Sequence, residues 1–280
     1  MKLRRIIYNR IWFALIFVAV AVAVIPLIAI LADVVYKGYS ALNVDFFTKL
    51  PPAPCPITNP KCSVGGLGDA IQGSLVLVGL SSAIGIPIGL ITGIYVAEYG
   101  NNAFGAAIGF LGDVLAGIPS IVTGILAFEL IVVPLRGYSV TAGSIALGSL
   151  MIPIVSNTSS VALKSVPNSV REAAHGLGVR KWRTTILIAA NAKRSIATAC
   201  LLAIARITGE TAPLILSSGI SELWYAGLGK PVASLTFYIY YFATSPYSNW
   251  IALAWGAALI LIIIVMGINI GVRILTRSKR

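Results

Sequence analysis

Residues 71–97 read IQGSLVLVGLSSAIGIPIGLITGIYVA and contain no Asp, Glu, Lys or Arg. A helix needs about 20 mostly apolar residues to cross the hydrocarbon core of a membrane, which is roughly 30 Å thick. This stretch is long enough to cross the core and to tilt or project beyond it. Gly85, Gly89 and Gly93 recur every four residues within it, and such a row lets a second helix approach closely. We therefore predict a transmembrane helix that packs against a neighbour.

Five further stretches on either side of it are also apolar enough, or nearly so, to span a membrane. They cover residues 11–31, 114–135, 141–161, 196–216 and 250–274. The first is longer than the apolar core of a signal peptide, which runs about 7–15 residues. Residues 29–32 also match a cleavage site poorly, so we interpret this stretch as a retained helix. The sequence thus predicts an all-α, polytopic membrane protein with six transmembrane helices.

The composition of the whole chain agrees with this fold class. Of its 280 residues, 58% are hydrophobic and 11% are charged, and the mean hydropathy is +0.91. A soluble domain carries about 25% charged residues, because it needs them to cover its surface. The composition therefore argues against a soluble domain and against a disordered chain. Three cysteines are too few for a secreted disulfide scaffold.

The net charge of +12 indicates the orientation of the chain in the membrane rather than binding to nucleic acid. Most of the 21 Lys and Arg residues lie in three segments, residues 2–10, 164–194 and 273–280. With six spans these segments share one side, and the positive-inside rule makes that side cytoplasmic. We therefore expect both termini in the cytoplasm. No soluble basic domain is present to bind nucleic acid.

The predicted outer segment at residues 33–68 contains a proline-rich stretch. Its prolines exclude regular helix, because proline lacks the backbone donor and clashes with the preceding turn. Cys55 and Cys62 bracket this stretch on the side away from the cytosol. We predict a disulfide between them, and two free thiols are the alternative.

Residues 167–178, PNSVREAAHGLG, lie between the fourth and fifth spans. Ser169 and Glu172 have the S-x-x-E spacing of a capping box, and Gly178 suits the position after a helix where φ is positive. The pattern predicts a short helix of about two turns on the cytoplasmic face, which a partner protein can hold. The alternative is an ordinary connecting loop.

The fifth predicted span contains Arg206 near its middle and Glu210 one helical turn later. A charge at the centre of a membrane costs about 2.5–3.5 kcal/mol, so Arg206 should face a cavity or the protein interior. Gly209 and Pro213 loosen the helix nearby. A guanidinium binds the oxygens of an oxyanion through two parallel hydrogen bonds. From these residues alone, an anion site and a structural ion pair fit equally well.

Several motifs carry a resemblance to a known family. Glu172-Ala173-Ala174, three further residues and Gly178 resemble the EAA loop of ABC importer permeases, although the leucine and proline that usually follow Ile188 are absent. Residues 92–100 (TGIYVAEYG), 176–182 and above all 203–213 (AIARITGETAP) resemble phosphate importer permeases of the PstA type. The proline-rich residues 51–54 followed by Gly65-Gly66-Leu67 are similar to the first outer loop of that type.

The resemblance implies a type I (MetI-like) permease fold. Residues 1–68 would form an N-terminal helix and the outer loop, and residues 69–280 a core with five spans and a coupling helix near 169–178. Arg206 and Glu210 would lie on the substrate path, and Glu172, Ala173, Ala174 and Gly178 would couple to the ATPase. The implied partners are a PstC-type permease, two PstB-type ATPase subunits and a PstS-type phosphate-binding protein, in a prokaryotic plasma (inner) membrane.

The expected function is therefore ATP-driven phosphate import by alternating access, and not catalysis. The sequence has no P-loop motif, so ATP and Mg²⁺ would be used by the partner ATPase, and this chain should bind no metal or cofactor. A permease for another oxyanion, such as sulfate or molybdate, is the nearest alternative, followed by a secondary transporter and then a membrane enzyme. Asp113 and Glu129 are expected to be packing or interface charges, and His175 a docking contact or a solvated side chain.

Overall fold

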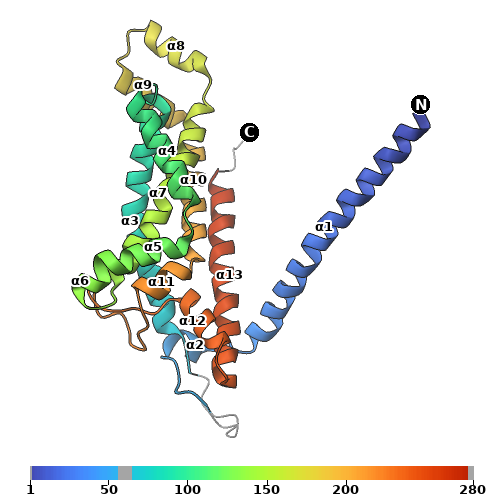
Figure 1. Ribbon diagram of the computed structural model, residues 1–280, viewed down its shortest axis with the longest axis vertical. Coiled ribbons are helices and arrows are strands. Elements are labelled where there is room, and N and C mark those ends of the chain that lie inside the picture. Colours follow the sequence, from blue (N-terminus) through green and yellow to red (C-terminus); the bar gives the residue numbers. More distant parts are fainter. Residues whose placement is uncertain (1, 56–64, 277–280) are drawn as a thin grey trace.

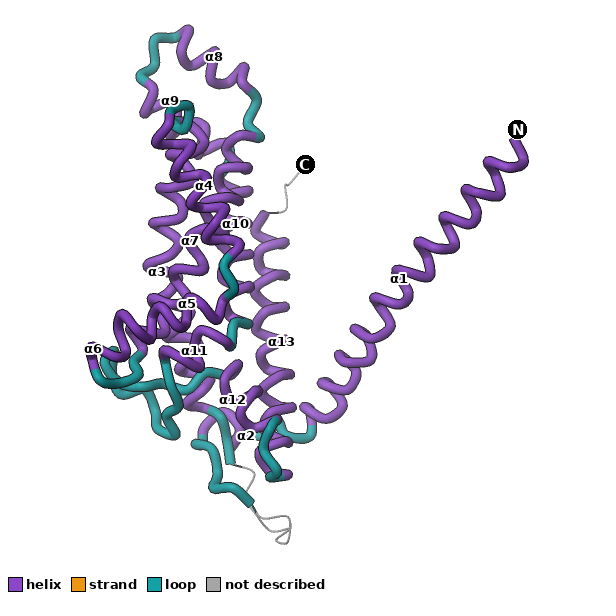
Figure 2. The backbone as a smooth tube through the Cα atoms, in the orientation of Figure 1, coloured by secondary structure: helices purple, strands orange, loops and turns teal. Residues whose placement is uncertain are grey.

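The computed structural model describes residues 2–55 and 65–276, and every regular element in these two ranges is a helix (Figure 1, Figure 2). The all-α prediction is confirmed. In chain order the helices are α1 (Lys2–Tyr39), α2 (Val44–Thr48), α3 (Gly68–Glu98), α4 (Ala103–Gly117), α5 (Ser120–Ala127), the π-helix η1 (Phe128–Val132), α6 (Val133–Leu135), α7 (Val140–Lys164), α8 (Asn168–Gly176), α9 (Lys181–Asn191), α10 (Lys193–Thr208), α11 (Ala212–Ser217), α12 (Leu235–Ala243) and α13 (Ser248–Thr276).

Four helical segments are long and apolar enough to cross a membrane, and two bent pairs pass the same test together. The four are Tyr8–Tyr39, Gly68–Glu98, Val140–Lys164 and Ser248–Gly271. The pairs are Ala103–Gly117 with Ser120–Leu135, bent by 99°, and Lys181–Asn191 with Lys193–Thr208, bent by 69°. The described part of the chain thus holds four candidate spans, or six if each bent pair counts as one.

The prediction that the third span is a single straight helix is wrong. The sequence predicts one span over residues 114–135, whereas α4 ends at Gly117 and α5 begins at Ser120 after a sharp bend. Pro119 causes the break, because proline cannot donate to the preceding turn. It also forces Ile118 into an extended conformation, with φ −71° and ψ 129°.

The fifth predicted span is also interrupted, at the place where the sequence indicated a weak point. Helix α10 ends at Thr208 and α11 starts at Ala212, so Gly209, Glu210 and Thr211 lie outside both helices. The prediction that Gly209 and Pro213 loosen this segment is confirmed. The predicted bounds of 196–216 lie within a few residues of the start of α10 at Lys193 and the end of α11 at Ser217, but the span is not one continuous helix.

The centre of the bundle is the contact between α3 and α7, which we call the α3–α7 seam. The glycine row of α3 lies directly on α7: a Cβ added at Gly85 would lie 2.8 Å from the Met151 Cβ, and one at Gly89 would lie 2.7 Å from the Val155 Cβ. At Gly93 it would lie 2.6 Å from the Ser156 carbonyl oxygen. The predicted close approach of a second helix is confirmed, and that helix is α7.

Helix α1 leaves the bundle at a wide angle (Figure 1). It meets α13 at Gly38, where an added Cβ would lie 2.7 Å from the Trp255 carbonyl oxygen. None of its most apolar 18-residue window is buried within the chain. Figure 1 also shows the start of α1 and the end of α13 on the side of the molecule toward α8.

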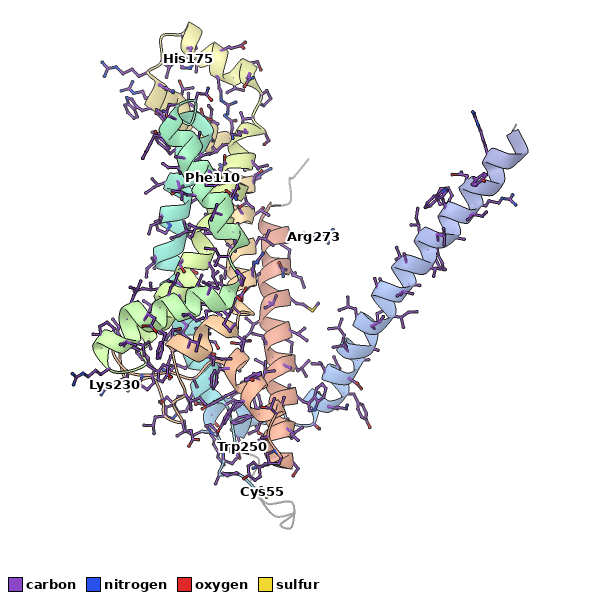
Figure 3. The ribbon with its side chains drawn as sticks, in the orientation of Figure 1. Cys55, Phe110, His175, Lys230, Trp250 and Arg273 are labelled. Atoms are coloured by element: carbon purple, nitrogen blue, oxygen red, sulfur yellow. The ribbon has the colours of Figure 1, made fainter. Side chains whose placement is uncertain are left out.

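The opposite end of the bundle anchors the proline-rich stretch. Residues 51–55 form no helix, and the Trp250 indole donates to the Pro52 carbonyl at 3.0 Å. The Asn249 side chain donates to the Ala53 carbonyl and accepts from the Cys55 amide. Figure 3 shows Cys55 and Trp250 together at this end. Cys55 is disulfide-bonded; Cys62 lies outside the described residues, so the pairing of these two cysteines stays a prediction.

The aromatic segment that follows α11 contributes to the core at this end. Helix α12 is too short to span a membrane. Its Tyr238 and Phe242 are buried and stacked, with ring centroids 4.7 Å apart, and Phe242 also contacts Trp250. The Tyr238 hydroxyl lies 3.0 Å from Oδ2 of the buried Asp69. Tyr240 and Tyr241 remain exposed, as an interfacial segment predicts.

Candidate functional site

A cavity of about 210 Å³ forms where the broken helices meet α7. Its walls come from the bend between α4 and α5, from the middle of α7 and from the end of α10. The lining residues are Leu115, Ala116, Ile118, Pro119, Ser120, Leu150, Pro153, Ile154, Arg206, Ile207 and Glu210. The charged residues of this lining are Arg206 and Glu210, which are also the two charged residues that the sequence indicated in the fifth span.

Arg206 and Glu210 share this cavity without pairing. Among the described residues, ion pairs form between Lys37 and Asp33, between Lys49 and Asp45, and between Arg171 and Glu98, but not between Arg206 and Glu210. The helix ends at Thr208, so the one-turn spacing expected from an unbroken helix does not apply. The alternative of a structural ion pair is therefore absent, and the guanidinium is available to a ligand.

The backbone around Glu210 is held by its own contacts. The Gly209 amide donates to the Arg206 carbonyl at 3.2 Å, and the Glu210 amide donates to the Ile207 carbonyl at 3.1 Å. The Thr236 hydroxyl donates to the Glu210 carbonyl at 3.1 Å. Helix α12 thus fixes the break in the fifth span, which positions the Arg206 and Glu210 side chains on the cavity.

The depth of the cavity follows from α7. Leu150, Pro153 and Ile154 lie near the middle of this 25-residue helix, whose length matches a membrane span. Arg206 therefore lies about halfway along the bundle, and its side chain is exposed in the isolated chain. A charge at that depth does not face lipid without a large cost. This face of the molecule must be covered by another protein chain or by water.

The other charges considered from the sequence lie away from the cavity lining. Asp113 accepts a hydrogen bond from the Asn157 side chain at 3.1 Å, which joins α4 to α7. Glu129 is exposed on η1. Among the described residues, no group of three or more His, Cys, Asp or Glu side chains is placed to hold a metal ion.

The predicted short helix is present as α8, at the far end of the bundle (Figure 1). Its C-terminus is a Schellman motif: the Gly178 amide donates to the His175 carbonyl at 2.9 Å, and the Val179 amide donates to the Ala174 carbonyl at 3.0 Å. Gly178 has φ +71°, so its predicted place after the helix is confirmed.

The predicted N-terminal capping box is wrong. Pro167 is the N-cap, and it makes no side-chain capping bond. The helix already starts at Asn168, so Ser169 lies inside it rather than at the N-cap. Glu172 is therefore not at the N3 position. The preceding proline is extended, with φ −55° and ψ 141°, and this sets the start of the helix one residue before the serine.

Most of α8 is open to a partner. Glu172, Ala173 and His175 are exposed, whereas Ala174 packs inward. Figure 3 shows His175 at the tip of the molecule. Leu177 just beyond the helix is 83% exposed, and Trp182 at the start of α9 is 51% exposed. Large apolar side chains grouped beside an exposed polar helix are typical of a protein interface.

Sequence reasoning missed the most heavily bonded side chain of this region. Arg171 forms a 2.7 Å ion pair with Glu98 at the end of α3, and it also donates to the Leu163 carbonyl in the last turn of α7 and to the Val166 carbonyl just after that helix. The only signal in the sequence was a single basic residue beside the E-A-A motif. Its partners Glu98, Leu163 and Val166 are 73, 8 and 5 residues away in the chain, so spacing could not identify them.

Comparisons with known proteins identify relatives over nearly the whole chain. Residues 85–280 match the family model described as "Binding-protein-dependent transport system inner membrane component". The phosphate transport system permease protein PstA of Haemophilus influenzae is 38% identical, over 98% of this chain and 95% of the relative. PstA of Yersinia pestis is 39% identical over 97% and 91%. PstA 1 of Mycobacterium tuberculosis (strain H37Rv) is 34% identical over 100% and 92%.

Similarity to solved structures supports the same fold. The chain resembles a subunit of the MetNI methionine ABC transporter in an inward-facing conformation, with a TM-score of 0.64 and 15% identity. The match covers 74% of this chain and 93% of that one. At this identity the likeness concerns the fold alone, and it agrees with the predicted type I importer permease fold.

Proposed function

The chain belongs to the family of binding-protein-dependent transport system inner membrane components, and within it to the PstA phosphate transport permeases, and on this premise we propose how it transports its substrate. It is a multi-pass inner-membrane protein and a transport subunit rather than an enzyme. Phosphate passes through the cavity beside Arg206, and movement of α8 by a cytoplasmic ATPase opens the cavity to one side of the membrane and then to the other.

The observation that carries this proposal is the unpaired Arg206 in a cavity at mid-height of the bundle. Its planar guanidinium suits the oxygens of phosphate, because it donates two parallel hydrogen bonds. Glu210 on the same wall repels the anion at short range. A site with one attractive and one repulsive charge binds phosphate weakly enough to release it, which transport requires.

The coupling surface lies on α8. Glu172 and Ala173 on the helix, and Gly178 after it, are exposed, while Ala174 seats the helix on the chain. We propose that this surface docks onto the ATPase, so the α8 end of the molecule and both termini face the cytoplasm. ATP and Mg²⁺ are bound by the ATPase, and this chain uses no cofactor of its own.

We propose that a second chain covers the exposed Arg206. One permease leaves this side chain open, so a related permease of the PstC type would complete the path and cover the exposed face. Exposed apolar side chains along α1 are available to the same partner or to lipid. Two PstB-type ATPase subunits and a PstS-type phosphate-binding protein at the outer mouth complete the transporter.

The direct test is Arg206→Gln in the complete transporter, reconstituted in liposomes with the ATPase and the binding protein. Hydrogen bonds to a charged group contribute about 1.5–3 kcal/mol, so uptake of labelled phosphate should fall by more than about tenfold. Arg194→Gln, an exposed arginine at the start of the same helix, should leave uptake unchanged. Normal uptake by Arg206→Gln, in a complex that assembles normally, would contradict the proposed path.

The same vesicles test the alternative functions. Unlabelled phosphate should compete with labelled phosphate, while sulfate and molybdate at equal concentration should not. Uptake that persists without the ATPase would instead indicate a secondary transporter. Stable recovery of the chain with a second permease and a P-loop ATPase would support the proposed assembly.

A further inference from the structure

Arg171 connects α8 to the ends of the two helices that form the α3–α7 seam. Its Nη2 lies 2.7 Å from Glu98 Oε1, and its Nε lies 3.4 Å from Glu98 Oε2. The same guanidinium donates to the Leu163 carbonyl at 2.9 Å and to the Val166 carbonyl at 2.7 Å. One side chain of α8 therefore binds α3, the last turn of α7 and the segment that leads into α8.

The position of Glu98 makes this contact necessary. Glu98 is the last residue of α3, and a helix C-terminus disfavours a negative charge. Its side chain is only 7% exposed, and that of Arg171 is 19% exposed, so water does little to stabilise either charge. Removing one partner of such a pair leaves the other charge buried and unpaired. The guanidinium satisfies Glu98 and also donates to the Leu163 carbonyl in the last turn of α7, which accepts from the Val166 amide as well.

The remaining contacts of α8 with the bundle are slight. Among its described residues, Arg171 alone makes side-chain hydrogen bonds to α3 and α7, and Ala174 is the one buried residue of the helix. Val170 adds an apolar contact with the buried cluster of Leu163, Val166, Ile188 and Ala192. Apart from the three-residue link 165–167, a displacement of α8 therefore reaches α3 and α7 mainly through Arg171 and this contact.

The path continues to the cavity. Helix α7 packs along α3 at the glycine row, so we expect the two helices to move together. The middle of α7 carries Leu150, Pro153 and Ile154, which line the cavity beside Arg206. Chains of packed side chains, hydrogen bonds and rigid helices can carry coupling between distant sites. Here that set runs from α8 through Arg171 to the end of α7, and along α7 to the cavity.

We propose that Arg171 is a positioning residue, which transmits the movement of α8 to the α3–α7 pair through Glu98 and the Leu163 carbonyl. This inference rests on the proposed coupling of α8 to an ATPase. It assigns Arg171 a role separate from docking, since its guanidinium points into the bundle contacts rather than toward the exposed face. Loss of the contact should let the ATPase work without moving the cavity walls.

The test is the number of phosphate ions taken up per ATP hydrolysed, measured on the reconstituted complete transporter. Arg171→Lys keeps a positive charge but loses the fork that binds Glu98 and two carbonyls together. Glu98→Gln removes the charge but keeps an acceptor of similar shape. Both should lower the ratio by about fivefold or more, while ATP hydrolysis continues. Lys164→Met, an exposed cation at the end of α7, should keep the wild-type ratio.

The ratio is taken per assembled complex, so a change in the yield of folded protein does not alter it. A purely structural Arg171 would give less complex with a normal ratio, and that result would overturn the inference. The double variant Arg171→Glu with Glu98→Arg should recover part of the ratio, because it restores the ion pair. If the unmodified transporter shows no ATP-dependent phosphate uptake at all, the proposed function fails instead.

Discussion

The α3–α7 seam and the cavity beside it use two faces of the same helix in opposite ways. On one face of α7, Met151 and Val155 meet the glycines of α3 so closely that an added Cβ would approach within 3 Å. On the neighbouring face, Leu150, Pro153 and Ile154 line an open cavity. The seam consists of two unbroken helices of 31 and 25 residues, whereas the opposite walls of the cavity come from helices that break.

The seam is therefore the closely packed part of the molecule, and the cavity is the part that carries polar groups. Breaks in membrane helices free polar backbone groups and are tolerated where they line a cavity. The bend at Pro119 and the end of α10 place two such breaks at the cavity, together with Arg206. The glycine contacts of the seam carry no charge, but they pack α7 closely against α3. The molecule thus combines one rigid wall with two walls that are able to rearrange.

The largest expected effects come from placing a tryptophan on each face of α7. Leu150→Trp puts the added volume into the cavity, so uptake should fall by at least about tenfold, equivalent to ~1.4 kcal/mol, with little change in thermal stability. Leu147→Trp puts the same volume into the core, where Leu147 is fully buried. Overpacking there should cost about 1–3 kcal/mol of unfolding free energy or more.

Phosphate uptake in liposomes and thermal unfolding in detergent measure the two effects separately. Equal destabilisation by both variants would show that Leu150 belongs to the packed core. Normal uptake by a stable Leu150→Trp transporter would place the substrate path elsewhere.

The sequence predicted the seam more completely than the cavity. A row of small residues at four-residue spacing is a local pattern, and Gly85, Gly89 and Gly93 therefore indicated a close helix contact before its partner was known. The position of Gly178 after a helix could also be predicted, because a positive φ after a helix is a local property. Hydropathy placed the long apolar helices α3, α7 and α13 to within a few residues.

The cavity depends on tertiary geometry that composition does not report. Hydropathy averages over a window, so it treated the stretch around Pro119 as one span although the chain bends there by 99°. The spacing of Arg206 and Glu210 implied a shared helix face only if the helix continued past Thr208, and it does not. The role of Arg171 depends on the ends of α3 and α7 lying side by side. These features need knowledge of which helix ends meet, which a single sequence does not contain.

The second prediction tests whether the seam depends on contact distance. Gly89→Ala adds a Cβ 2.7 Å from the Val155 Cβ and 2.9 Å from the Ile152 carbonyl oxygen, and a backbone atom cannot move aside at low cost. We expect a loss of about 1–3 kcal/mol in unfolding free energy. Gly79→Ala on the same helix meets nothing within 4 Å and should gain up to ~1 kcal/mol from helix propensity.

Unfolding of the purified protein by SDS in mixed micelles measures both changes. We expect Gly89→Ala to lower the unfolding free energy and Gly79→Ala to raise it. If Gly89→Ala were as stable as Gly79→Ala, the close approach of α3 and α7 would not contribute to the stability of the seam.

The smallest effect separates close packing from hydrogen bonding within the seam. The Ser81 hydroxyl is fully buried and shares its one proton between the Leu77 carbonyl at 2.6 Å and, across the seam, the Ser144 carbonyl at 3.1 Å. Ser82 next to it donates only within α3, to the Val78 carbonyl at 2.7 Å. Hydrogen bonds between membrane helices contribute about 0.6 kcal/mol on average. Ser81→Ala should therefore lose roughly that amount relative to Ser82→Ala in the same SDS titration. A loss as large as that of Gly89→Ala would mean that the hydrogen bond rather than the glycine contact holds α7 on α3, and that the rigid wall of the cavity depends on a single hydroxyl.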